Sequence, residues 1–215
     1  NEQILTLTPR NIGEVVWSPD GQSVAYHSTT EGDSDPNIYT YNVVLGSTPR
    51  QITFEGQNTR PIFSPDGTRI AFTSEREGTD GEDLWVKTLN DDQPARSILR
   101  LPGVEFATHW PSDTLIMFEQ GPGPGDLWIL DLSSDSAVAR IYLSLEADLD
   151  DVVVSQDGAL AAYASNETGP SEIYIRSFPE PGERTSVSEG GGQFPQWSPD
   201  GNTVYYWTPS LFGEN

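Results

Sequence analysis

Aspartate and glutamate side chains are concentrated in three short segments of this sequence. Carboxylates at such density attract divalent cations or the lysine and arginine side chains of a peptide. Because connecting loops are generally polar and exposed, the alternative is a set of solvated loops that bind nothing. The acidic residues are Glu31, Asp33 and Asp35 in the first segment, Glu75, Glu77, Asp80, Glu82 and Asp83 in the second, and Glu146, Asp148, Asp150 and Asp151 in the third; Arg10, Arg60 and Arg76 are the expected counter-charges.

The segment Asp33-Ser34-Asp35-Pro36-Asn37 alternates oxygen ligands as the start of a calcium-binding loop does. It lacks the glycine at the sixth place and the bidentate glutamate at the twelfth place of such a loop. We therefore expect no cofactor and no metal, and keep Ca²⁺ as the minor alternative.

The residues that usually carry catalysis are scarce. His27 and His109 are the only histidines, and neither has metal-ligand spacing to another His, Asp or Glu. The sequence contains no HExxH motif, no GxSxG nucleophile motif and no cysteine, which leaves thiolate and disulfide chemistry out. The sequence therefore predicts that the protein is not an enzyme.

The chain has 215 residues, a formal net charge of −22 and a pI near 4.1. A field of this sign repels nucleic-acid phosphates and anionic lipid headgroups, so we expect no nucleic-acid partner. No apolar run approaches the roughly 20 residues that span a bilayer, so we expect no membrane insertion. The remaining expectation is a protein or peptide partner.

A repeated turn organises the strands that must position these residues. The sequence Trp17-Ser18-Pro19-Asp20-Gly21 returns around Asp66, Asp157 and Asp200, and in a worn form without glycine around Asp113. Proline presets φ for a type I turn, and glycine accepts the left-handed conformation that closes a tight hairpin. The aspartates are 46, 47, 44 and 43 residues apart, a period typical of a propeller or a solenoid.

Short alternating strands surround each turn, and no segment has a helical period. The sequence therefore predicts a single all-β domain over residues 1–215, a β-propeller of about five four-stranded blade units with the fifth incomplete. The aromatic residues ahead of the turns are expected to pack between blades. The units are residues 14–54, 59–101, 105–144, 151–188 and 193–215, with an additional N-terminal strand at residues 3–8.

The run of WSPDG, apolar hairpin and (D/E)(I/L)(Y/W) resembles the repeat of TolB-like β-propellers, also called PD40 or WD40-like repeats. The stretch from Ser165 to Trp197 is similar to the propeller domains attached to bacterial serine/threonine kinases. The resemblance implies a sensing or scaffolding domain in the periplasm or another extracytoplasmic compartment, although the first residues carry no signal-peptide pattern. A six-bladed ring of this period needs about 270 residues, so the chain is either a five-bladed ring or part of a longer one.

In such propellers, the loops between the second and third strands lie on one face around the channel, together with the crossings between blades. The resemblance therefore places the acidic segments on one rim, and we expect a non-enzymatic protein- or ligand-binding module that binds there. One alternative is a propeller-fold enzyme or gating domain, either a metal-dependent lyase or the propeller of a serine peptidase without its catalytic domain. Another is a structural fragment that forms a homodimer through open blade edges at Gln3–Thr8 and Val204–Thr208.

Overall fold

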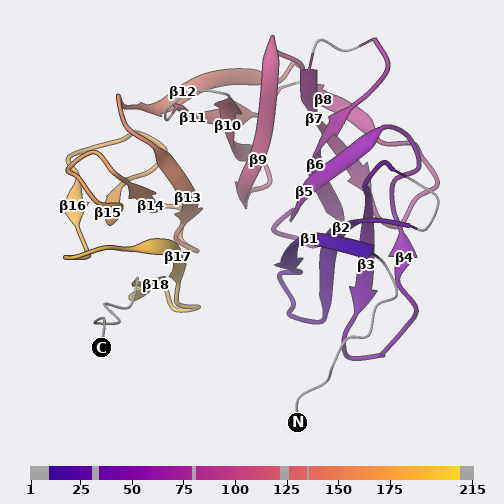
Figure 1. Cartoon of the computed structure of the whole chain (residues 1–215), viewed down its shortest axis with the longest axis horizontal. Helices are drawn as coiled ribbons and strands as arrows, with labels where there is room; N and C mark the ends of the chain where they lie inside the picture. Colours follow the sequence, from indigo (N-terminus) through magenta and orange to yellow (C-terminus); the bar gives the residue numbers. More distant parts are fainter. Residues whose placement is uncertain (1–9, 31–33, 79–80, 122–125, 135, 209–215) are drawn as a thin grey trace, which may run out of the picture. The chain divides into compact units, whose positions relative to one another are not determined.

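The computed structural model describes residues 10–30, 34–78, 81–121, 126–134 and 136–208, and only the backbone of residues 10 and 11. Every regular element in these ranges is a β-strand (Figure 1). This confirms the all-β prediction. None of these elements is a helix with the length and hydropathy needed to cross a bilayer.

The strands follow one another in antiparallel groups of four, which are the blades of a propeller (Figure 1), and a short parallel pairing of β7 with β9 joins the second and third groups into one eight-stranded sheet. Blade 1 contains β1 (Arg10–Trp17), β2 (Ser23–Thr29), β3 (Asn37–Asn42) and β4 (Arg50–Gln51); blade 2 contains β5 (Gln57–Phe63), β6 (Arg69–Glu75), β7 (Gly81–Thr88) and β8 (Arg96–Leu99). Blade 3 contains β9 (Gly103–Ser112), β10 (Leu115–Gly121), β11 (Asp126–Asp131) and β12 (Val138–Ser144); blade 4 contains β13 (Leu149–Val154), β14 (Leu160–Ser165), β15 (Glu172–Ser177) and β16 (Thr185–Ser186). β17 (Gln193–Trp197) and β18 (Val204–Trp207) form a final two-stranded sheet. The predicted strand at residues 3–8 lies outside the described residues.

The repeated turn has the same hydrogen bonds in each of its four full copies. In the first copy, the Gly21 amide donates to the Ser18 carbonyl at 2.9 Å, and Gly21 has a φ of 67°. The Ser18 hydroxyl donates to Asp20 Oδ1 at 2.6 Å, and the Gln22 amide donates to the same oxygen at 3.0 Å. Serine and aspartate therefore hold the turn from inside, while glycine supplies the left-handed residue.

The worn third copy also forms a hairpin. β9 ends at Ser112 and β10 begins at Leu115, so Asp113 and Thr114 alone connect the two strands. Neither Asp113 nor Thr114 has a positive φ, so this shorter loop does not need the left-handed glycine of the other copies.

Two of the outermost strands, β4 and β16, are two residues long, and a side chain supplies part of the pairing beyond each. The Ile38 amide donates to the Thr53 hydroxyl at 2.9 Å, and the Ile173 amide donates to the Ser188 hydroxyl at 2.8 Å. One backbone bond also continues beyond each strand: the Ile52 amide donates to the Ile38 carbonyl at 2.7 Å, and the Val187 amide donates to the Ile173 carbonyl at 2.8 Å.

The chain divides into two compact units, Asn1–Ala107 and Thr108–Asn215. In the first unit, Ala25 and Ile38 of blade 1 pack against Ile70, Phe72 and Trp85 of blade 2. In the second unit, the core joins Met117, Leu127 and Ile129 of blade 3 to Val152, Ala161 and Tyr163 of blade 4. Apolar faces of adjacent blades therefore form both cores.

The predicted aromatic packing layer is only partly correct. Trp110 is 4% exposed, as expected of a residue between two blades. Trp17 at the equivalent position is 61% exposed and therefore does not belong to a buried packing layer.

Candidate functional site

The innermost strands of four blades carry one non-glycine residue each in the left-handed region. These residues are Glu14, Arg60, Asp151 and Phe194, with φ values of 22°, 49°, 57° and 54°. Each lies three residues before the end of its strand, at a shift in the register with the next strand. A bulge of this kind re-aims a side chain, and a strained residue at a repeated position is a reason to look there for function.

In the first unit, the two bulge residues form an ion pair. Arg60 Nε lies 3.7 Å from Glu14 Oε1, and the Arg60 guanidinium lies 4.1 Å from the centre of the Phe106 ring. Both ion-pair side chains are about half-exposed, so the guanidinium remains accessible to solvent. β1, β5 and β9 each contribute one residue to this contact.

Two carboxylates face each other nearby. Glu75 at the end of β6 pairs directly with Glu82 at the start of β7. Burial raises the pKa of Glu82, the Glu75 charge raises it further, and the Arg60 charge opposes the shift. Glu75, Glu82 and Arg60 therefore share one electrostatic environment, and we call Glu14, Arg60, Glu75, Glu82 and Phe106 the Arg60 cluster.

His27 adjoins this cluster from β2. A Cβ added to Gly13, its partner on β1, would lie 2.1 Å from His27 Nε2, so the ring packs directly on the glycine backbone. Burial lowers the pKa of His27, the Glu14 charge opposes the shift, and the Arg60 charge adds to it. Burial and the Arg60 charge therefore favour the neutral form of His27.

The predicted acidic residues of the first unit have different surroundings. Glu75 and Glu77 are exposed, Asp35 and Glu82 are half-buried, and Asp83 is 3% exposed. Arg100 Nε lies 3.4 Å from Asp83 Oδ2, yet burial still raises the pKa of Asp83. Asp83 thus lies inside the blade rather than on a solvated rim. Asp33, Asp80 and the Arg10 side chain lie outside the described residues.

Of the predicted counter-charges, Arg60 lies at the site and Arg76 does not. The Arg76 guanidinium stacks 3.8 Å from the Trp85 ring centre and bonds to Glu55 at 2.8 Å. Its side chain is 15% exposed. Arg76 therefore stabilises the wall of blade 2.

In the second unit, the predicted acidic residues are held by the backbone and by an amide. The Asp148 carboxylate accepts from Asn166 Nδ2 at 2.6 Å, and Asp151 Oδ2 accepts from the Phe194 amide at 3.2 Å. Burial raises the pKa of Asp151, the Phe194 amide opposes the shift, and Asp150 adds to it. Asp150 itself is exposed. The bulge residues Asp151 and Phe194 are thus linked directly.

The sequence interpretation missed Glu14 and Phe106. The signal for Glu14 was its place three residues before Trp17, which matches Arg60 before Phe63 and Asp151 before Val154. Phe106 had no such signal, because its contact with Arg60 joins two blades.

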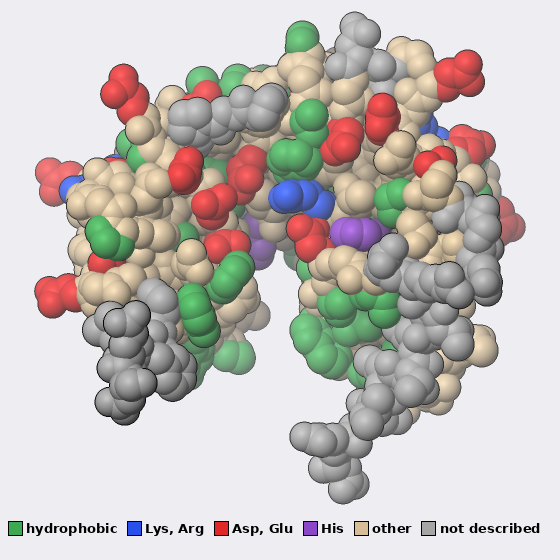
Figure 2. Space-filling view, viewed as in Figure 1, with side chains coloured by type: hydrophobic (Ala, Val, Ile, Leu, Met, Phe, Trp, Pro, Cys, Tyr) green, Lys and Arg blue, Asp and Glu red, His purple; other side chains and the backbone are tan. Residues whose placement is uncertain are grey.

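Within the described ranges, no three His, Asp or Glu side chains are grouped so that they could hold a metal ion. Acidic side chains are spread over the visible surface and basic ones are few (Figure 2). The arrangement is suited to attracting positive charge.

No protein-family model matches this sequence, and no curated protein matches it. Solved structures do. TolB from Acinetobacter baumannii has a TM-score of 0.75 at 23% identity, over 94% of this chain and 49% of TolB. A puromycin-hydrolyzing peptidase from Mycobacterium tuberculosis has a TM-score of 0.69 at 19% identity, over 91% of this chain and 33% of the peptidase. The Cps50 (Swd1) β-propeller domain from Myceliophteria thermophila has a TM-score of 0.66 at 11% identity, over 94% and 69% of the two chains.

These matches establish the fold, which is that of the TolB-like β-propellers. The chain spans only about half the length of A. baumannii TolB. Since one fold serves many functions, the function has to be argued from the residues of the site.

Proposed function

We propose that this chain is a non-enzymatic, protein-binding β-propeller module, and that its first unit receives a basic segment of a partner protein at the Arg60 cluster. The observation that carries the proposal is the direct pairing of Glu75 with Glu82 across β6 and β7. Like charges directly opposite one another destabilise a strand pair. A lysine or arginine of the partner would offset this repulsion.

The rest of the cluster fits the same role. Arg60 is the one cation among the described members, against the carboxylates of Glu14, Glu75 and Glu82, so the cluster carries excess negative charge. The Phe106 ring already holds one guanidinium on its face. The net charge of −22 would also speed the approach of a basic partner at low salt.

The test is a titration with a fluorescent (Arg-Gly-Ser)₄ peptide, followed by anisotropy at two salt concentrations. The double variant Glu75→Gln/Glu82→Gln should weaken binding by about 30-fold, because each of the two lost pairs with a charged group contributes roughly 1 kcal/mol. Raising the salt from 0.05 to about 0.3 M should weaken binding to the wild type further.

The matched control is Glu183→Gln/Glu189→Gln, which removes the same charge from two exposed positions of the second unit. This control should bind the peptide about as well as the wild type. Equal losses in the two double variants would show that the peptide responds to net charge alone, and the proposal would then fail.

A second candidate is the propeller portion of a serine peptidase. The match to the mycobacterial peptidase, over 91% of this chain and 33% of that enzyme, favours it. A gating propeller without its catalytic domain cleaves nothing, so the peptide titration separates the two candidates. Peptide binding that depends on Glu75 and Glu82 fits a binding module, and absence of such binding fits a gating domain.

The extracytoplasmic location and the attachment to a kinase, both implied by the resemblance, remain predictions. So does the homodimer. Tyr205 and Trp207 on β18 are 63% and 53% exposed, which gives the second unit an apolar edge strand. Light scattering on a size-exclusion column measures the mass against the 23.6 kDa of one chain.

A further inference from the structure

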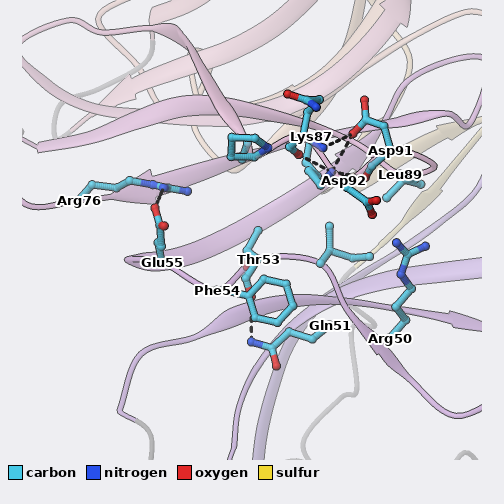
Figure 3. A pocket seen from close by; sticks show the side chains of 14 residues that line it. Arg50, Gln51, Thr53, Phe54, Glu55, Arg76, Lys87, Leu89, Asp91 and Asp92 are labelled. Carbon is cyan, nitrogen blue, oxygen red and sulfur yellow. Dashed lines mark hydrogen bonds and ion pairs between the residues drawn. The ribbon is translucent and has the colours of Figure 1, made fainter.

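A cavity of about 310 Å³ lies in the first unit, apart from the Arg60 cluster (Figure 3). The segment from β4 to Glu55 forms one wall, and the end of β7 with the following loop forms the other. The volume falls within the range of small-molecule sites.

The floor and one wall of the cavity are apolar. Ile52 is 5% exposed and packs in the core between blades 1 and 2, with Leu89 and Ala95 at its side. Phe54 is 76% exposed and extends beside this floor (Figure 3). An exposed aromatic ring beside aliphatic side chains offers a surface for an apolar group.

Four of the charged residues at the cavity form two ion pairs with one another. Arg76 bonds to Glu55 at 2.8 Å. The Lys87 ammonium donates to Asp91 Oδ1 at 2.9 Å, to the Asp91 carbonyl at 2.8 Å and to the Gln93 carbonyl at 2.6 Å. All three protons of Lys87 are used, so the ammonium fixes the loop that forms the wall.

The other two charged residues are available. Arg50 and Asp92 are exposed, and neither side chain has a hydrogen bond or an ion pair within the described part of the chain. Figure 3 shows Arg50, Leu89 and Asp92 on one side of the cavity, and Arg76 with Glu55 on the opposite side. One free cation, one free anion and an apolar wall therefore border the same space.

We propose that this cavity binds a free α-amino acid with a large apolar side chain. Its carboxylate pairs with Arg50, its ammonium pairs with Asp92, and its side chain lies against Phe54, Leu89 and Ile52. A guanidinium matches a carboxylate with two parallel hydrogen bonds. A ligand with only a negative charge or only a positive charge would pair with just one of Arg50 and Asp92.

The test is an NMR titration of the whole chain with L-phenylalanine, with a Kd expected at or below about 1 mM. Three related ligands each lack one element: phenylalaninamide lacks the carboxylate, N-acetylphenylalanine lacks the ammonium, and glycine lacks the side chain. Each should bind about tenfold more weakly or worse.

The variants assign the contacts. Arg50→Gln should weaken phenylalanine binding about tenfold and leave phenylalaninamide binding unchanged, because that ligand has no carboxylate to lose. Asp92→Asn should also weaken phenylalanine binding about tenfold but leave N-acetylphenylalanine binding unchanged, because that ligand has no ammonium to lose. Arg96→Gln, at an exposed arginine on β8 that does not line the cavity, is the control and should change the binding of neither ligand.

Absence of saturable binding by phenylalanine and by leucine would overturn the proposal. So would an equal effect of Arg50→Gln and Arg96→Gln, which would indicate attraction to net charge. These outcomes are independent of the peptide titration, because the Arg60 cluster contributes no residue to the cavity.

Discussion

The side chain of Glu105 is buried at the position that the amide of Asn58 occupies one blade earlier. Both residues lie five places before the aromatic residue that ends the inner-strand repeat, Trp110 and Phe63 respectively. Both are 0% exposed. Asn58 is satisfied: its amide donates to Asn37 Oδ1 at 3.2 Å and its carbonyl accepts from the Ser74 hydroxyl at 2.9 Å. The carboxylate of Glu105 has no hydrogen-bond partner among the described residues.

We predict that Glu105 makes stability depend on pH. Burial raises its pKa to about 7, the Leu101 backbone opposes the shift, and the Asp83 charge adds to it. The folded protein therefore holds a proton that the unfolded chain releases near pH 4.5. The stability that protonated Glu105 contributes to the folded protein is fully present below pH 4.5 and is lost as the pH rises to about 7.

Glu105→Gln should remove this dependence. Relative to the wild type, the free energy of unfolding of the variant should rise between pH 4.5 and pH 8, by at most about 3 kcal/mol. Urea denaturation of both proteins at pH 4.5 and at pH 8 measures these free energies of unfolding. Glu146→Gln, at an exposed position, should show no such rise. A pH-independent difference for Glu105→Gln would contradict the prediction.

Asn58 provides the complementary experiment. Asn58→Ala removes the donor to Asn37 Oδ1 and to the Glu55 and Gly56 carbonyls, and it removes the acceptor of the buried Ser74 hydroxyl. The variant should lose roughly 2–3 kcal/mol in urea denaturation. Asn90→Ala, at an exposed turn position, should lose less than about 0.5 kcal/mol. A small loss at Asn58 would mean that water replaces the amide.

Gly81 and Gly158 both have a backbone conformation that disfavours a side chain, with φ values of 156° and 70°, and only Gly81 adds a steric clash to this strain. A Cβ on Gly81 would lie 1.7 Å from the Gly103 carbonyl oxygen, where β7 and β9 run parallel. A Cβ on Gly158 would meet nothing within 4 Å, although its φ is 70°. Gly158→Ala should therefore cost about 1 kcal/mol, and Gly81→Ala about 3 kcal/mol or more, in thermal or urea unfolding. Similar losses would show that β7 and β9 can separate freely.

The hairpins could be predicted from the sequence because their causes are local. Ser18, Asp20 and Gly21 bond within one turn, and the same letters give the same bonds around Asp66, Asp157 and Asp200. The blade order followed from the period. The glycine-free hairpin after Ser112 shows that strand pairing can complete a turn whose own residues are weak signals.

The candidate site could be predicted only in part, because its contacts join different blades. Residue type alone could not predict that Asp83 in the second acidic segment is buried while Glu77 is exposed. Arg100, which follows β8, lies against both Asp83 and the Trp85 ring of β7, and this contact comes from a distant part of the sequence. The left-handed conformation of Arg60 depends on the register of β5 with β6 and leaves no mark in composition.

The strain at Arg60 leads to a last prediction, which compares Arg60→Ala with Arg60→Gly. Both changes remove the Glu14 ion pair and the Phe106 contact, together worth about 1 kcal/mol at exposed positions. Alanine keeps the unfavourable φ of 49°, whereas glycine relieves it by roughly 1 kcal/mol. Arg60→Ala should therefore be less stable than the wild type, and Arg60→Gly should be close to it. Both variants should bind the arginine-rich peptide several-fold more tightly, because the carboxylates of Glu14 and Glu82 lose their counter-charge. Equal stability of the two variants would show that the bulge is unstrained. Weaker peptide binding in both would show that Arg60 itself contacts the partner, and the acidic members of the cluster would then not be the binding surface.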